Sequence, residues 1–131
     1  MGTNDGVLPD TCAWVDFFNA RRTPLAIAIE GSLVRGNIHT CGIVKFELVQ
    51  GLRNRNEEKV LLDALQAVTH LEMTESLWLA AGRLSATLRK KGVTIPLSDL
   101  LIAALALHHD LTVLTVDRHF DHVAGLRVSA G

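Results

Sequence analysis

From residue 111 to residue 117 the chain reads Leu111-Thr112-Val113-Leu114-Thr115-Val116-Asp117, a largely apolar stretch that ends on an acid. A second short stretch, Gly6-Val7-Leu8-Pro9, is followed in the same way by Asp10. Neither stretch reads as a strand with one face in water and one face in the core. Buried strands separated by helices are typical of a parallel sheet covered on both faces, so these stretches predict an α/β fold.

The segments between these strands carry helical patterns. Pro24 suits the first turn of a helix that ends near Gly36, and Gly92 follows a helix closed by basic residues. Pro96-Leu97-Ser98-Asp99 starts a helix that is apolar nearly all round and should be buried, with Ser98 as the expected N-cap. We predict helices at 12–19, 24–34, 42–52, 57–68, 74–91 and 96–109, and strands at 7–10, 37–41, 69–73, 111–115 and 126–129.

Size and composition limit what the chain can be. Its 131 residues, 48 % of them hydrophobic, are enough for a single domain, residues 1–131, with a substantial core. No run approaches the roughly 18 apolar residues of a membrane span, and the first residues show no leader pattern, so we expect no membrane and a cytoplasmic location. The apolar content also favours burial against a second subunit. The net charge of −1 argues against a partner bound through a broad basic face.

The cysteines and histidines give weaker signals. Cys12 and Cys41 have neither a C-x-x-C nor a zinc spacing, which is typical of reduced cysteines in or near a core. The pairs at 108–109 and at 119 and 122 suggest metal ligands, although helix ends and surface loops explain them as well. His119, two residues after Asp117, could approach a site at that acid.

Four carboxylates are attached to apolar runs. Asp10 and Asp117 follow strands, Glu47 lies inside a helix among apolar neighbours, and Asp99 opens the most apolar helix. Burying an unpaired charge costs more than packing returns, so each acid is either turned outward or held for a purpose. As a group they would suit Mg²⁺ or Mn²⁺, which prefer oxygen ligands. The residues alone leave open a helix-start role for Asp99 and a turn role for Asp117.

Four segments around these acids resemble the signature segments of PIN-domain proteins, most closely the VapC-type toxins of bacterial toxin–antitoxin pairs. Each segment alone is unspecific, but the four occur in order and with ordinary spacing between residues 6 and 128. They are Asp10-Thr11-Cys12-Ala13-Trp14, Glu47-Leu48-Val49-Gln50-Gly51, Asp99-Leu100-Leu101-Ile102-Ala103-Ala104 and Thr115-Val116-Asp117-Arg118-His119-Phe120.

The resemblance implies a three-layer α/β/α sandwich with a central parallel sheet of about five strands. It also implies a metal-dependent endoribonuclease that cleaves structured RNA, a cognate VapB-type antitoxin and a homodimer. The four acids fall on the family's acidic positions, and Thr11 and Thr115 fall on polar positions of the same motifs. Cys12 stands where the family commonly has serine.

On this basis we expect Asp10, Asp99 and Asp117 to bind Mg²⁺ or Mn²⁺, with Glu47 completing the pocket or a second site. Hydrolysis would leave 3′-hydroxyl and 5′-phosphate ends, with the metal lowering the pKa of the attacking water. The most plausible contacts to RNA phosphates are basic residues after two helices, although a solvated surface also explains them. These are Arg21, Arg22, Arg53 and Arg55.

The sequence also bears on two other kinds of function. A PIN-fold protein that has lost catalysis could act as a binding module, but the presence of all four acids argues against such decay. A phosphoaspartate receiver usually has an acidic pair near its first strand, and a haloacid-dehalogenase-type phosphatase has Asp-x-Asp. The first strand here is followed by Asp10-Thr11-Cys12, which fits neither pattern.

Overall fold

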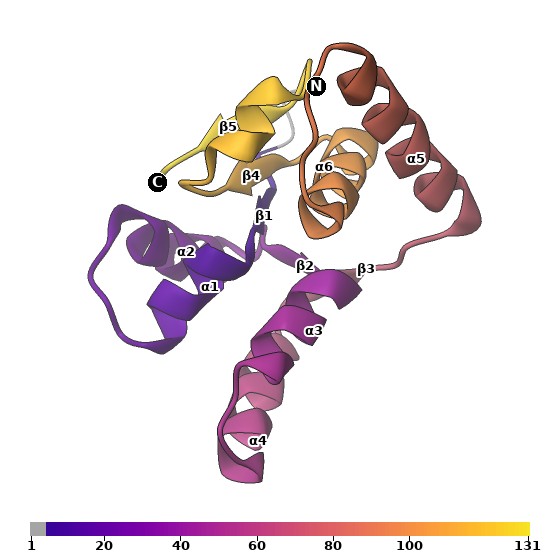
Figure 1. Ribbon diagram of the computed structural model, residues 1–131. Helices are drawn as coiled ribbons and strands as arrows, with labels where there is room; N and C mark the ends of the chain where they lie inside the picture. Colours follow the sequence, from indigo (N-terminus) through magenta and orange to yellow (C-terminus); the bar gives the residue numbers. More distant parts are fainter. Residues whose placement is uncertain (1–4) are drawn as a thin grey trace.

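The computed structural model describes residues 5–131, so the first four residues, on which part of the expectation about a leader rests, lie outside the described residues. Strands and helices alternate along this part of the chain (Figure 1). The strands are β1 (Val7–Pro9), β2 (His39–Cys41), β3 (Thr69–Leu71), β4 (Thr112–Leu114) and β5 (Arg127–Ser129). The helices are α1 (Thr11–Phe18), α2 (Pro24–Arg35), α3 (Gly42–Gln50), α4 (Arg55–Leu65), α5 (Glu75–Lys90), α6 (Leu97–His109) and the short 3₁₀ helix η1 (Arg118–His122).

All the described strands pair in parallel, as expected for an α/β fold. The strands β1, β4 and β5 form a three-stranded sheet in the order β1-β4-β5, while β2 and β3 form a separate pair. A parallel bridge between Val7 and Ile38 links β1 to the residues just before β2. The expected five strands are therefore present, but their pairing is divided three and two, with this single bridge in place of a ladder between β1 and β2.

The helices cover the strands from two sides. Figure 1 shows α1 and α2 on one side of the strands and α5 and α6 on the other, while α3 and α4 extend together away from them. Helix α6 lies deepest, because the whole run 99–106 is buried. This confirms the sequence expectation that a helix apolar nearly all round would lie inside the molecule.

Helix ends follow the capping signals in most places. Thr23 caps α2 by accepting a hydrogen bond from the backbone of Ala26, and Gly36 ends that helix with a left-handed backbone. The expected N-cap at Ser98 is wrong. Helix α6 already begins at Leu97, because Pro96 has the extended backbone of the capping position, and Ser98 therefore lies within the first turn. The 3₁₀ helix η1 was not expected from the sequence.

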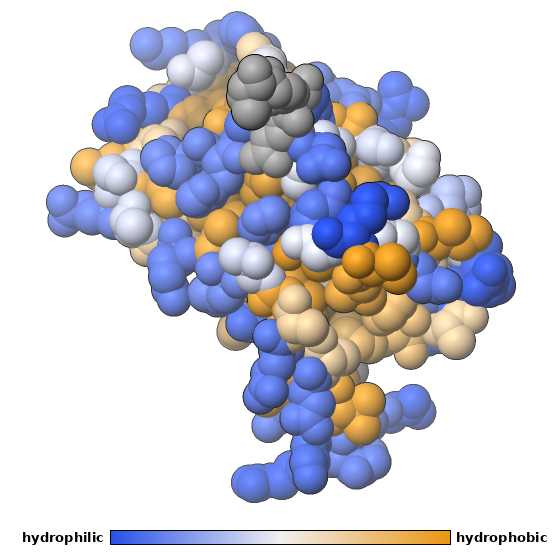
Figure 2. All heavy atoms as spheres, turned by 180° about the vertical axis from the view of Figure 1, so that it is seen from behind, coloured by the Kyte–Doolittle hydropathy of each residue, from blue (hydrophilic) through white to orange (hydrophobic). Residues whose placement is uncertain are grey.

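The surface mixes polar and apolar residues. In the rear view of Figure 2, hydrophilic residues dominate the α3–α4 projection, and apolar residues gather in patches on the body above it. Across residues 5–131, no helix combines the length and the apolar character needed to cross a bilayer.

Candidate metal centre

The four predicted acids line one pocket of about 460 Å³. Asp10 follows β1 directly, and Asp117 lies three residues beyond the end of β4, which pairs in parallel with β1. Asp99 comes from the first turn of α6, and Glu47 comes from α3. The pocket therefore lies at the carboxyl ends of two neighbouring parallel strands, where α/β sheets bind their ligands.

Asp10 is held by donors from three directions. Its Oδ1 accepts a hydrogen bond from the backbone N–H of Ala13 at 3.1 Å and from the Cys12 thiol at 2.9 Å. Its Oδ2 accepts from the hydroxyl of Thr115. Asp10 is the N-cap of α1 and only 5 % exposed, so the helix dipole and these donors stabilise a carboxylate that has left water.

Two threonine hydroxyls connect the acids to their surroundings. Thr11 donates to Oε1 of Glu47, which ties α1 to α3 across the pocket. Thr115 donates to Asp10 and its hydroxyl oxygen also accepts the backbone N–H of Asp117 at 2.8 Å. The two positions expected to be accessory polar residues thus contact three of the four acids.

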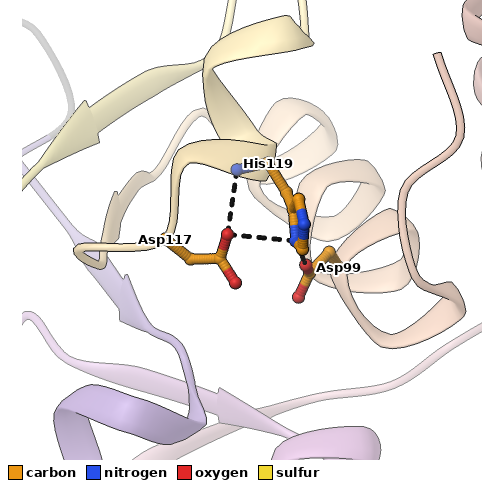
Figure 3. A group of neighbouring side chains, drawn as sticks. All are labelled: Asp99, Asp117 and His119. Carbon is orange, nitrogen blue, oxygen red and sulfur yellow. Dashed lines mark hydrogen bonds and ion pairs between the residues drawn. The ribbon is translucent and has the colours of Figure 1, made fainter.

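Asp99 and Asp117 meet on the other side of the pocket, with the ring of His119 between them (Figure 3). Nδ1 of His119 lies 2.8 Å from Oδ2 of Asp99 and 3.0 Å from Oδ1 of Asp117. Oδ1 of Asp117 also accepts the backbone N–H of His119 at 2.9 Å, as the cap of η1. One donor atom from each of these three residues lies within 4.8 Å of the others, an arrangement that could hold a metal ion.

The pocket favours a bound cation. Burial raises the pKa of Asp99, and the nearby charges of Asp117 and Asp10 raise it further, against the lowering effect of the hydrogen bond with His119. The hydrogen bond to Asp99 is also the main reason that the pKa of His119 is raised. A positive charge near Asp99 and Asp117 would therefore offset both the burial of Asp99 and the repulsion from its acidic neighbours.

The donor set fits a divalent cation. Among the pocket-lining residues in the described part of the chain, four are carboxylates and none is lysine or arginine. Carboxylate oxygens, and the imidazole nitrogen of His119 beside them, are ligands that divalent metal ions accept. A cation in the pocket would also offset the repulsion between the clustered acids, which a single imidazole balances only in part.

Cys12 lies at the mouth of this pocket with its thiol facing Asp10. Burial and the neighbouring carboxylate raise the pKa of the thiol to about 11, so it stays protonated and can donate to Asp10. A serine hydroxyl could make the same hydrogen bond. The departure from the family's usual residue therefore preserves a donor at this position.

His119 is the residue of this site that sequence reasoning underrated. Its distance of two residues from Asp117 was visible, but a loop histidine is usually a surface residue. The side chain of Asp117 turns the backbone by capping the N–H of His119, and this turn directs the imidazole toward Asp99, 20 residues earlier. The Asp-x-His spacing at the end of a buried strand is the signal that could have indicated it.

The four arginines expected to contact RNA lie away from the acids. None of them lines the acidic pocket within residues 5–131. Arg21 and Arg22 follow the far end of α1, about 12 Å from the end that carries Asp10. Arg21 pairs with Asp16, and Arg53 pairs with Glu57. Arg55 begins α4 and is exposed. A role in RNA binding for these residues stays a prediction.

Comparison with known proteins places the chain among others of the same fold. The family model described as "PIN domain" matches residues 7–126. Two curated proteins of Mycobacterium tuberculosis are similar in sequence. Ribonuclease VapC21 is 29 % identical over 104 residues, which cover 75 % of this chain and 73 % of that protein. Ribonuclease VapC11 is 28 % identical over 122 residues, which cover 90 % and 91 %.

A solved structure supports the fold. A chain in the structure of DNA-bound VapBC from Salmonella typhimurium superposes with a TM-score of 0.81 at 21 % identity, covering 95 % of this chain and 97 % of that one. At this identity the likeness shows the fold, and the chemistry has to be argued from the pocket itself.

Proposed function

This chain belongs to the PIN domain family, and from that premise we propose that it is a metal-dependent endoribonuclease, the toxin of a VapBC-type toxin–antitoxin pair. The similar proteins VapC21 and VapC11 are named ribonucleases, which supports a hydrolase acting on RNA phosphodiester bonds. Structured RNA is the proposed substrate, and a cytoplasmic location is part of the same proposal.

One observation carries this proposal: four carboxylates from four separate segments of the chain converge on one pocket. A fold gains no stability from gathering acids whose charges repel. The convergence is therefore explained by function, and divalent cations are the ligands that acids of this kind bind.

The residues of the pocket divide the work. Asp99, Asp117 and Asp10 would hold Mg²⁺ or Mn²⁺, directly or through water, and Glu47 would complete the pocket or a second site. When bound, the cation would supply a Lewis acid that activates water and stabilises the leaving oxygen of the phosphodiester. Thr115 and Thr11 orient Asp10 and Glu47 through their hydroxyl groups. The exposed side of the pocket leaves room for the RNA backbone.

A protein partner is supported by an apolar pocket next to the acidic one. This second pocket, of about 310 Å³, lies between α1, α3 and α4, and Glu47 lines both pockets. Val15 and Val60, which line it, are exposed in the isolated chain. An exposed apolar pocket beside an active site suits a protein that covers the site, and we propose a VapB-type antitoxin as this partner.

A homodimer is supported by the surface of α5 and α6. Trp78 and Leu79 on α5 and Leu107 on α6 are each at least 41 % exposed. Exposed large apolar side chains on these two packed helices suit burial against a second copy of the chain, as the family resemblance implies. Light scattering of the purified chain in solution should give the mass of a dimer.

The activity is tested by incubating the purified chain with total RNA in Mg²⁺, in Mn²⁺ and in a chelator. We expect cleavage with either cation and none with the chelator. Asp99→Asn should lower the rate by at least about 100-fold, because it removes a charged ligand while preserving shape. Asp63→Asn, at an exposed acid of α4 outside the pocket, is the matched control and should cleave as the parent does.

The same assay separates the toxin from a binding module that has lost catalysis. If calorimetry detects binding of neither Mg²⁺ nor Mn²⁺ to the parent chain, the metal site is absent and the proposed activity fails. If Asp99→Asn cleaves RNA as fast as the parent, the activity does not belong to this pocket.

A further inference from the structure

The imidazole of His119 lies where a metal ligand would lie. Its Nδ1 atom contacts one oxygen of Asp99 and one oxygen of Asp117, at 2.8 Å and 3.0 Å (Figure 3). His119 belongs to η1, and Asp117 is the residue that caps η1. Asp99 comes from a different element, the first turn of α6. One ligand atom from each of the three residues lies within 4.8 Å of the other two, which is the arrangement expected of three ligands around one metal ion.

The backbone around His119 holds this position. The side chain of Asp117 caps η1 by accepting the N–H of His119, and Phe120 anchors the same helix in the core with no exposed surface. The backbone of His119 is therefore held on one side by the cap from Asp117 and on the other by the buried ring of Phe120.

Stability alone does not explain the contact. The side chain of His119 is 46 % exposed, and that of Asp117 is 38 % exposed. An exposed ion pair usually adds little to the stability of a fold. A residue that contributes so little to packing, yet is directed at two acids by a capped turn, is better explained by what it binds.

We propose that Nδ1 of His119 is a direct ligand of the cation in this pocket, together with Asp99 and Asp117, and that it makes the site prefer Mn²⁺ to Mg²⁺. This rests on the proposed metal-dependent function. Mg²⁺ strongly prefers oxygen ligands, whereas transition-metal ions accept an imidazole nitrogen. Exchanging one oxygen ligand for Nδ1 therefore costs Mg²⁺ more than it costs Mn²⁺.

The first test uses the unmodified chain loaded with Mn²⁺ and pulsed electron paramagnetic resonance. We expect a nitrogen coupling from a directly bound imidazole, which changes when the chain is made with ¹⁵N-labelled histidine. This readout requires neither activity nor a variant that folds. Bound Mn²⁺ without the imidazole coupling would overturn the proposal and leave the metal site intact.

The second test assigns the nitrogen to His119. His119→Ala should lose the coupling and bind Mn²⁺ at least about tenfold more weakly, while Mg²⁺ affinity changes much less. His122→Ala is the matched control, because His122 is exposed on the same short helix but does not belong to the group that His119 forms with Asp99 and Asp117. It should keep both the coupling and the affinity.

Tighter binding of Mn²⁺ after removal of the imidazole would mean that His119 opposes metal binding. If His119→Ala binds Mn²⁺ more tightly than the parent, the protonated imidazole competes with the cation, and the proposal is wrong. If the parent binds neither Mn²⁺ nor Mg²⁺, the proposed metal-dependent function fails along with the ligand assignment, which distinguishes the two failures.

Discussion

The carboxylates on the two sides of the acidic pocket are stabilised by different kinds of partner. On one side, Asp10 is buried and its oxygens accept hydrogen bonds from a backbone N–H, a thiol and a hydroxyl. On the other side, Asp99 and Asp117 share one exposed imidazole. The first arrangement gives the carboxylate oxygens of Asp10 hydrogen-bond partners within the protein. The second leaves two neighbouring acids with a single basic partner between them. From this difference we predict that Asp10 contributes to the stability of the metal-free chain, whereas Asp99 would be stabilised mainly by the proposed cation.

The largest contrast is expected in the stability of the metal-free chain. Asp10→Asn should lower the free energy of unfolding by about 2 kcal/mol, because the donors around it lose a charged acceptor. Asp99→Asn should leave that free energy unchanged or raise it at pH 7.5, because burial raises the pKa of Asp99 and the neutral amide avoids its buried charge. Urea unfolding in a chelator measures both.

Equal destabilisation by the two substitutions would contradict the difference between the two sides. Asp63→Asn serves again as the control for removing one negative charge at an exposed position.

A smaller loss of stability is expected when the hydroxyl of Thr115, which hydrogen-bonds to residues on both sides of the pocket, is removed. Thr115 is 2 % exposed, donates to Asp10 and accepts from the backbone of Asp117. Thr115→Val keeps the shape but removes the hydroxyl that donates to the buried Asp10 and accepts the partly buried N–H of Asp117, which should cost about 1–2 kcal/mol. Affinity for Mn²⁺ should fall roughly tenfold, because one ligand loses its orienting partner. Thr115→Ser should restore both values, and calorimetry and urea unfolding measure them.

In the metal-free chain, the stabilising contact between His119 and Asp99 should depend on pH. The hydrogen bond to Asp99 raises the pKa of His119 above its ordinary value of 6.5. A raised value in the folded state means that the stabilisation is fully present below pH 6.5 and is lost as the pH rises through the raised pKa. Nuclear magnetic resonance of labelled histidine should show the raised pKa, and Asp99→Asn should lower it. An unchanged pKa in Asp99→Asn would remove the hydrogen bond as its cause.

The smallest effect is expected at Cys12. Because Ser can donate to Asp10 as the thiol does, Cys12→Ser should change the rate of RNA cleavage by no more than about twofold. The pKa of about 11 should also make Cys12 slow to alkylate at pH 8, roughly 100-fold slower than an ordinary thiol. Mass spectrometry of the alkylated peptide measures this rate, and Cys41, which is buried, is read from a separate peptide.

Local sequence signals predicted much of the fold. The proline of α2 and the glycine that ends it appear where expected, because each restricts or permits a backbone conformation without help from distant residues. The N-cap of α6 is Pro96 and not Ser98, so the helix begins one residue before the position that the sequence predicted for its cap. The division of the sheet also escaped prediction, because pairing between β1 and β2 depends on how two distant segments align at Val7 and Ile38.

The sequence by itself determined which residue types were available: four acids attached to apolar runs, in segments that resemble those of one family. It could do so because burying a charge is costly, so an acid in such a place is informative wherever the chain goes. Only the tertiary structure decided that these acids meet in one pocket, that Thr115 joins Asp10 to the turn of Asp117, and that His119 faces Asp99. Contacts between residues as far apart as Asp10 and Thr115 depend on strand pairing and helix packing, which local patterns do not contain.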